Sequence, residues 1–232
     1  MARFLTTIGF DADDTLWHNE RFFKLTQDRF AELLADHADP DHLAERLLAA
    51  ERRNLGHYGF GIKGFVLSMI ETALEVTENR VPGEVIADLI AAGKEMLSHP
   101  IELMPHARDA VEAVADTHRV LLITKGDLLD QERKLAQSGL GELFHGVEIV
   151  SDKTKPVYEE IFDRHGNGPD RGMMIGNSMK SDVVPMVQAG GWGIYVPATL
   201  TWELERADAP ESDRYHHIDT LAELPAILGQ IE

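Results

Sequence analysis

The chain has 232 residues, of which 44% are hydrophobic and 27% are charged, a balance typical of globular proteins rather than disordered, collagen-like or membrane chains. It contains no cysteine, which excludes disulfide frameworks, thiolate zinc sites, iron–sulfur clusters and cysteine nucleophiles. Its 22 Lys and Arg residues against 40 Asp and Glu residues give a formal net charge of −18, which disfavours nucleic acid and anionic membranes as partners.

The start of the chain carries one Arg and reaches carboxylates before a signal-peptide core could form. No later apolar run approaches membrane-spanning length. The sequence therefore predicts a soluble cytoplasmic protein.

The first expected element is a short strand over 2–10, and the next β-rich run comes only at 119–124. Between them, the spacing of apolar residues is typical of helices. The segment 56–61, Gly-His-Tyr-Gly-Phe-Gly, is predicted to be a loop because it is too rich in glycine for a helix interior. The expected helices span 21–35, 40–53, 63–76 and 82–97, with Pro40 and Pro82 at the starts of the second and the fourth.

After Pro105 helices and strands alternate. This alternation of short apolar strands with helices predicts an α/β protein with a Rossmann-like, three-layer parallel sheet core, covered by helices on both faces. The expected strands span 120–124, 147–150, 173–175, 194–196 and, weakly, 215–218, and the expected helices span 107–115, 128–137, 158–164 and 181–189, with a last one from 221.

The first strand belongs to this sheet, although about a hundred residues separate it from the second. We therefore predict one α/β core domain made of residues 1–18 and 100–232. Residues 19–99 are predicted to form an inserted, all-helical cap domain.

Polar side chains follow each of the first four strands. In open parallel sheets ligands bind beyond the carboxyl ends of the strands, so these residues are expected to lie together. They are Asp11 and Asp13 after the first strand, Thr124, Lys125 and Gly126 after the second, Ser151, Asp152 and Lys153 after the third, and Gly176, Asn177, Ser178 and Asp182 after the fourth.

Clustered carboxylates repel one another, so Asp11 and Asp13 indicate either a bound cation or a retained proton. A site built from oxygen ligands favours Mg²⁺. The same two carboxylates can divide the cleavage of a phosphate ester. One acts as the nucleophile that forms an aspartyl phosphate, and the other acts first as an acid and then as a base.

The motifs together resemble those of the haloacid dehalogenase-like hydrolase superfamily: Asp-x-Asp-x-Thr after the first strand, Thr after the second, Lys after the third and Gly-Asn-x-x-x-x-Asp after the fourth. The inserted helices resemble that superfamily's cap domain, so the resemblance covers the whole chain. It implies a Mg²⁺-dependent phosphomonoester hydrolase that acts on a small phosphorylated metabolite through an aspartyl-phosphate intermediate.

The resemblance also implies roles for individual residues. Asp11 would attack phosphorus, and Asp13 would protonate the leaving oxygen and later deprotonate the attacking water. Thr124 would hydrogen-bond the transferring phosphoryl group, and Lys153 would offset its charge. The implied Mg²⁺ ligands are the Asp11 carboxylate, the main-chain carbonyl of Asp13 and an acid of the fourth motif, while Lys125 and Gly126 are candidate substrate contacts.

Asp13 also separates branches of the superfamily. The dehalogenases lack an acid at this position, because a halide leaves without a proton whereas an alkoxide needs one. The chain therefore resembles the phosphatase branch.

Two positions depart from, or leave open, the superfamily pattern. The commoner residue at position 177 is Asp, and the amide of Asn177 is at best a neutral ligand, so Asp182 is the preferred charged ligand and a weaker affinity for Mg²⁺ is expected. Lys155 is an alternative to Lys153. We prefer Lys153 because it comes sooner after its strand.

The predicted cap loop offers His57, Tyr58 and Phe60 as candidate substrate contacts, although it can equally be a plain helix connection. Three alternative functions stay open: a phosphomutase on the same scaffold, a phospho-accepting signalling module, and an inactive relative that only binds a partner. The sequence makes no prediction of oligomeric state or of the particular substrate.

Overall fold

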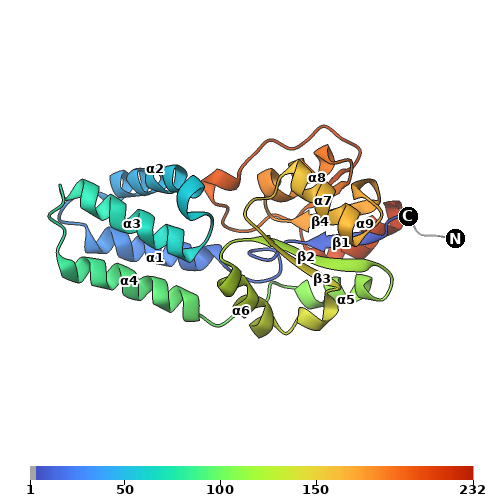
Figure 1. Cartoon of the computed structure of the whole chain (residues 1–232), viewed down its shortest axis with the longest axis horizontal. Helices are drawn as coiled ribbons and strands as arrows, with labels where there is room; N and C mark the ends of the chain where they lie inside the picture. Colours follow the sequence, from blue (N-terminus) through green and yellow to red (C-terminus); the bar gives the residue numbers. More distant parts are fainter. Residues whose placement is uncertain (1–3, 232) are drawn as a thin grey trace. The chain divides into compact units, whose positions relative to one another are not determined.

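The computed structural model describes residues 4–231. The strands in this range form one sheet, and all neighbouring strands are parallel (Figure 1). Their order is β3-β2-β1-β4-β5-β6, the order of Rossmann-like folds. The predicted parallel α/β core is therefore confirmed. The strands are β1 (Thr7–Phe10), β2 (Arg119–Lys125), β3 (Gly146–Val150), β4 (Gly172–Gly176), β5 (Trp192–Tyr195) and β6 (Tyr215–His217).

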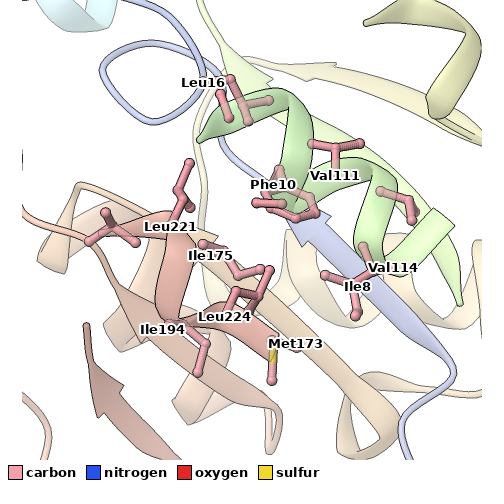
Figure 2. Packing of buried hydrophobic residues seen from close by; sticks show 14 of the residues in the cluster. Ile8, Phe10, Leu16, Val111, Val114, Met173, Ile175, Ile194, Leu221 and Leu224 are labelled. Carbon is pink, nitrogen blue, oxygen red and sulfur yellow. The ribbon is translucent and has the colours of Figure 1, made fainter. Parts of the chain in front are cut away.

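Side chains alternate between the two faces of the sheet, and each face has its own hydrophobic core. On one face Phe10 and Leu122 pack with Val111 of α5 and Leu224 of α9, part of the cluster drawn in Figure 2. On the other face Ile123 packs in the cluster that contains residues of α7 and α8. The helices of this part are α5 (Ala107–Ala115), α6 (Leu128–Ser138), α7 (Lys155–His165), α8 (Val184–Gln188) and α9 (Leu224–Ile231).

The residues between β1 and β2 contain four long helices: α1 (Glu20–Leu33), α2 (Pro40–Tyr58), α3 (Ile62–Val76) and α4 (Gly83–Ser98). Buried residues such as Phe30, Leu47 and Met69 give them a core of their own. A close approach of α3 and α4 requires Gly93, because a Cβ at that position would lie 2.5 Å from Val66. Among residues 4–231, none of the helices combines the length and the apolar composition that a membrane-spanning helix needs.

The contacts divide the chain into two compact units. Among the described residues, one unit comprises 4–20, 101–125 and 131–231, and the other comprises 21–100 and 126–130. The first contains the parallel sheet, and the second contains the helices α1 to α4.

Several predicted elements have different ends in the structure. The loop expected at 56–61 is shorter, because α2 continues through Gly56 to Tyr58 and stops at Gly59, whose φ of 72° breaks the helix. The helix expected at 181–189 is instead a π-helical turn, Met179–Val183, followed by α8. The first strand begins at Thr7, and residues 2–3 of the strand expected over 2–10 lie outside the described residues.

The strand register brings the ends of the strands to one edge. Phe10 lies beside Leu122 of β2 and Ile175 of β4, so the residues that follow these three positions emerge together. β1 lies in the middle of the sheet, between β2 and β4, where the order of the strands reverses. In open α/β sheets, ligands bind at this point.

Candidate active site

A buried lysine joins two acidic residues at the carboxyl edge of the sheet. The Lys153 ammonium donates hydrogen bonds to Asp11 Oδ1 and, over 2.7 Å, to Asp182 Oδ1. The side chains of Lys153, Asp11 and Asp182 are only 1%, 9% and 1% exposed. Two carboxylates share one ammonium in a dry site, so a further positive group would be stabilising there.

Burial and charge shift the ionisation of this cluster. Burial, only partly opposed by the Lys153 ammonium, raises the pKa of Asp11 to about 7. The two carboxylates outweigh the effect of burial on Lys153 and raise its pKa above the usual range. Lys153 therefore keeps its charge, and Asp11 is the group that is easier to neutralise.

Local backbone geometry holds Asp182 in place. The Ser178 main-chain N–H donates to Asp182 Oδ2 over 2.9 Å, inside the π-helical turn that follows β4. Only glycine fits at position 176, because a Cβ there would lie 2.2 Å from the Asp182 carboxylate. The buried Tyr158 hydroxyl secures the same turn by donating to the Ser181 carbonyl over 2.9 Å.

Oxygen atoms converge on the side chain of Asn177. The atom of its amide that faces the cluster is 3.3 Å from Asp11 Oδ2, 3.1 Å from the main-chain oxygen of Asp13 and 3.3 Å from Thr15 Oγ1. Thr15 Oγ1 in turn donates to Asp11 Oδ2 over 3.1 Å. No group of three or more Asp, Glu or His side chains suited to a metal ion occurs among residues 4–231, so this mixed set of oxygens is the candidate cation site.

The Asp13 carboxylate is surrounded by donors. Oδ1 accepts from Trp17 Nε1 over 2.7 Å and from Lys134 Nζ over 3.0 Å. Oδ2 accepts from Gln131 Nε2 over 2.8 Å and from Lys134 Nζ over 3.1 Å. Because a carboxylate has about four lone-pair positions, these contacts account for its accepting capacity and fix its orientation.

Asp14 fixes the start of α1. Its two carboxylate oxygens accept from the main-chain N–H groups of Asn19 and Glu20, over 2.9 and 2.8 Å. Burial raises the pKa of Asp14 to about 6 in spite of these two hydrogen bonds. Its left-handed backbone, with φ of 59°, suits an Asp in a tight turn.

Glu205 ends the short 3₁₀ helix Glu203–Glu205 between β5 and β6 and connects two of the strand ends. It accepts from Lys125 Nζ and from the Ser178 and Ser181 hydroxyls, each over 2.5 Å. Burial acts to raise its pKa, but the Lys125 ammonium and the hydroxyl donors lower it. Lys125 also donates to Ser181 Oγ over 2.7 Å, so it braces the loop that carries Asp182.

The predicted residues divide into two groups. Asp11, Asp13, Lys153, Asn177 and Asp182 form the connected network described above, and Lys125 and the buried Thr124 lie at the end of β2. By contrast, the alternative lysine, Lys155, is in α7, half-exposed and paired with Glu159 at 3.6 Å, while Gly126 follows β2 with φ of 137°. Three further candidate contacts belong to the helical unit: His57 and Tyr58 end α2, with the Tyr58 hydroxyl bonded to Glu71, and Phe60 lies in the turn after it.

The residues that orient the acids were not predicted from the sequence. Gln131 and Lys134 stand three positions apart on α6, the spacing that puts two side chains on one helix face, and they directly follow the second motif. This spacing could have predicted that the two side chains lie near the second motif. Glu205 gave no such signal, because it ends a 3₁₀ helix of three residues, Glu203–Glu205, which is too short to show a periodic pattern.

Comparison with known proteins identifies the family. A model of the haloacid dehalogenase-like hydrolases matches residues 5–190. The chain is 28% identical, over 214 residues, to the glyceraldehyde 3-phosphate phosphatase of Methanothermobacter thermautotrophicus, covering 87% of this chain and 89% of that protein. It therefore belongs to the haloacid dehalogenase-like hydrolases, as its motifs predict.

Solved structures agree with this assignment. The crystal structure of a haloacid dehalogenase-like family hydrolase from Xanthomonas campestris matches with a TM-score of 0.88 and 39% identity, over 98% of this chain and 91% of that chain. The hydrolase YfnB of Bacillus subtilis has the same fold, with a TM-score of 0.67 and 18% identity over 97% and 99% of the two chains. Family and relatives together support an enzyme of the phosphatase type.

The raised pKa of Asp11 predicts a pH-dependent effect of the Asp11→Asn substitution on stability. Because the folded-state pKa of about 7 exceeds the ordinary value of 3.8, the parent loses stability as the pH rises between these values. The Asn variant lacks that loss. In buffer with a chelator it should be more stable than the parent at pH 8 by about 1–3 kcal/mol, with the difference disappearing near pH 4.

Denaturant unfolding of both proteins across this pH range measures the difference directly. Carboxyl groups that do not interact with Asp11 cancel in the comparison because both proteins carry them. A difference that stays constant between pH 4 and pH 8 would contradict the assigned ionisation of Asp11.

Proposed function

We propose that this chain is a Mg²⁺-dependent phosphomonoester hydrolase that forms a transient aspartyl phosphate on Asp11. The observation that carries the proposal is the pairing of Asp11 with the buried Lys153 beside a second acid, Asp13, whose orientation is fixed by its own donors. A nucleophilic carboxylate, a positive charge next to it and a separate acid are the groups that phosphate ester cleavage requires.

The donor set at Asn177 fits a magnesium ion. Two oxygens in neighbouring positions around octahedral Mg²⁺ lie about 3 Å apart, and the Asn177 amide is 3.1 Å from the Asp13 carbonyl and 3.3 Å from Asp11 Oδ2. We therefore propose these three groups as protein ligands. When bound, the ion would neutralise charge on the phosphoryl oxygens.

Asp182 receives a different role from the one expected. Its two oxygens accept from Lys153 and from the Ser178 N–H, so its support for the site is through Lys153. We propose that Asp182 positions the ammonium and keeps it charged, and that the cation is bound mainly by the Asn177 side of the cluster.

The proposed reaction has two halves. In the first, an Asp11 carboxylate oxygen attacks phosphorus while the bond to the leaving oxygen breaks and that oxygen takes a proton from Asp13. In the second, Asp13 removes a proton from a water molecule that attacks the same phosphorus, which frees inorganic phosphate and restores Asp11. Thr124 would hydrogen-bond the phosphoryl group, and Lys153 would offset its charge in both halves.

Asp13 must release at least one donor before it can exchange a proton, because all of its lone-pair positions face protein groups in this structure. Lys134 contributes two of these contacts and is itself held by Asn19 Oδ1 over 2.8 Å. We propose that Lys134 and Gln131 position Asp13 for the leaving group.

The proposed substrate is a small phosphorylated metabolite. The relative from M. thermautotrophicus carries the name of a three-carbon aldehyde phosphate, so such compounds are the first to test. We propose that residues 19–99 serve as a cap domain that selects the substrate, because they are inserted between the first and second motifs. The substrate contacts His57, Tyr58, Phe60, Lys125 and Gly126, the cytoplasmic location and the exclusion of nucleic acid and membrane stay predictions.

A phosphate-release assay with Mg²⁺ over a panel of metabolites tests this function. We expect Asp11→Asn to abolish turnover of every active compound, because an amide cannot accept the phosphoryl group in this way. Its folded state should be intact by circular dichroism. Undiminished hydrolysis of an aryl phosphate by this variant would end the assignment, and an isomerised sugar phosphate in place of free phosphate would indicate a mutase.

Lys134→Met tests the positioning of Asp13. Alkyl phosphates need a proton on the leaving oxygen whereas p-nitrophenolate leaves without one, so we expect kcat to fall by about 10²-fold for the alkyl ester and only a few-fold for p-nitrophenyl phosphate. Lys155→Met, which removes a half-exposed lysine in α7, is the matched control and should change neither rate. Equal losses on both esters would contradict the role of Lys134.

A further inference from the structure

The side-chain amide of Asn177 has two ends with opposite hydrogen-bonding character, and both can face the same three oxygen atoms. With the oxygen inward, the amide presents an acceptor to Asp11 Oδ2 and to the Asp13 carbonyl, two groups that are themselves acceptors. With the nitrogen inward, it can donate to Asp11 Oδ2, to the Asp13 carbonyl and to Thr15 Oγ1 over 3.1 to 3.3 Å. The two arrangements differ only by a half-turn about the bond to the amide.

Each orientation suits a different state of the site. Without a cation, inward oxygens would repel one another, and the amide nitrogen relieves this by donating to the Asp13 carbonyl and, in addition to Thr15, to Asp11 Oδ2. With Mg²⁺ present, the inward oxygen is an acceptable, neutral ligand. A carboxylate at position 177 would offer only oxygens and would add a charge to the existing pair, Asp11 and Asp182.

We propose that Asn177 acts as a reversible placeholder in the metal site: its amide nitrogen occupies the site in the metal-free protein, and a half-turn of the amide presents its oxygen when Mg²⁺ binds. The proposal rests on the proposed Mg²⁺ site. The neighbouring groups favour it, because the main-chain N–H of Asn177 donates to Thr15 Oγ1 over 3.0 Å and holds the residue while its side chain turns.

The amide at position 177 lowers the affinity for Mg²⁺ and raises the stability of the metal-free protein. The metal-free protein keeps its oxygens hydrogen-bonded and stays folded at low Mg²⁺. The ion must displace the amide nitrogen and gains only a neutral ligand, so its affinity is lower than with an acid at this position. Asn177→Asp should therefore destabilise the metal-free protein and bind Mg²⁺ more tightly.

The experiment is a Mg²⁺ titration of the full-length protein at pH 8 by calorimetry, together with thermal unfolding in a chelator and in saturating Mg²⁺. For Asn177→Asp we expect Kd for Mg²⁺ to fall by at least about tenfold and the metal-free Tm to fall by roughly 3–8 °C. Saturating Mg²⁺ should restore its Tm to that of the parent or above. None of these readouts depends on catalysis.

Two further variants serve as controls. Asn167→Asp adds the same charge by the same substitution at an exposed position before β4, at the opposite edge of the sheet, and should change Kd less than twofold. Asn177→Ala removes both the donor and the ligand. It should lower the metal-free Tm and also weaken Mg²⁺ binding. Because this variant adds no charge, both changes would come from loss of the amide itself.

The outcomes distinguish this inference from the proposed function. If the parent binds no Mg²⁺ at millimolar concentration, the metal site is wrong and both proposals fail. If the parent binds Mg²⁺ but Asn177→Asp leaves both the metal-free Tm and Kd unchanged, the placeholder is wrong and the hydrolase proposal survives. If Asn177→Asp binds Mg²⁺ more tightly but its metal-free Tm is unchanged, the placeholder is also wrong, because the amide then has no role in the empty site.

Discussion

The proposed active site depends on one buried ammonium group held between two carboxylates. Lys153 lies after β3, Asp11 after β1 and Asp182 after β4, so the contact joins three strand ends that are separated in the sequence by up to 171 residues, the difference between 11 and 182. A buried carboxylate without such a partner would be strongly disfavoured. The ammonium therefore makes it possible to bury Asp11, the proposed nucleophile, in a cluster that largely excludes water.

The fold supplies the geometry that this contact needs. Parallel strands in adjacent register deliver their following residues to one edge, and Gly176 leaves the space that the Asp182 carboxylate occupies. Donors from α6 orient Asp13, and Glu205 braces the loop after β4 through Ser178 and Ser181. The carboxylates are thus fixed by contacts within the motifs and by hydrogen bonds from elements outside them, such as α6.

Much of this arrangement follows from the sequence because strand ends in a parallel sheet must meet. The positions of Asp11, Asp13, Lys153 and Asp182 were predictable from their places after apolar strands, and the order of their motifs indicated the family. The supporting residues were harder to predict. The sequence shows Lys134 only as a lysine in a helix, three positions from Gln131, and does not show that both side chains contact Asp13. The end of α2 was also hard to predict, because the helix passes through Gly56 and stops at Gly59.

The central claim is that Asp11 carries the phosphoryl group during turnover, and reductive trapping tests it most directly. Borohydride reduces an acyl phosphate to an alcohol, so quenching the Mg²⁺-loaded enzyme with borohydride during turnover of an active substrate should convert residue 11 to homoserine, identified by mass spectrometry of the peptide around it. We predict this conversion only when substrate is present. Steady phosphate release with residue 11 recovered as unmodified aspartate, or with the modification at another residue, would contradict the account.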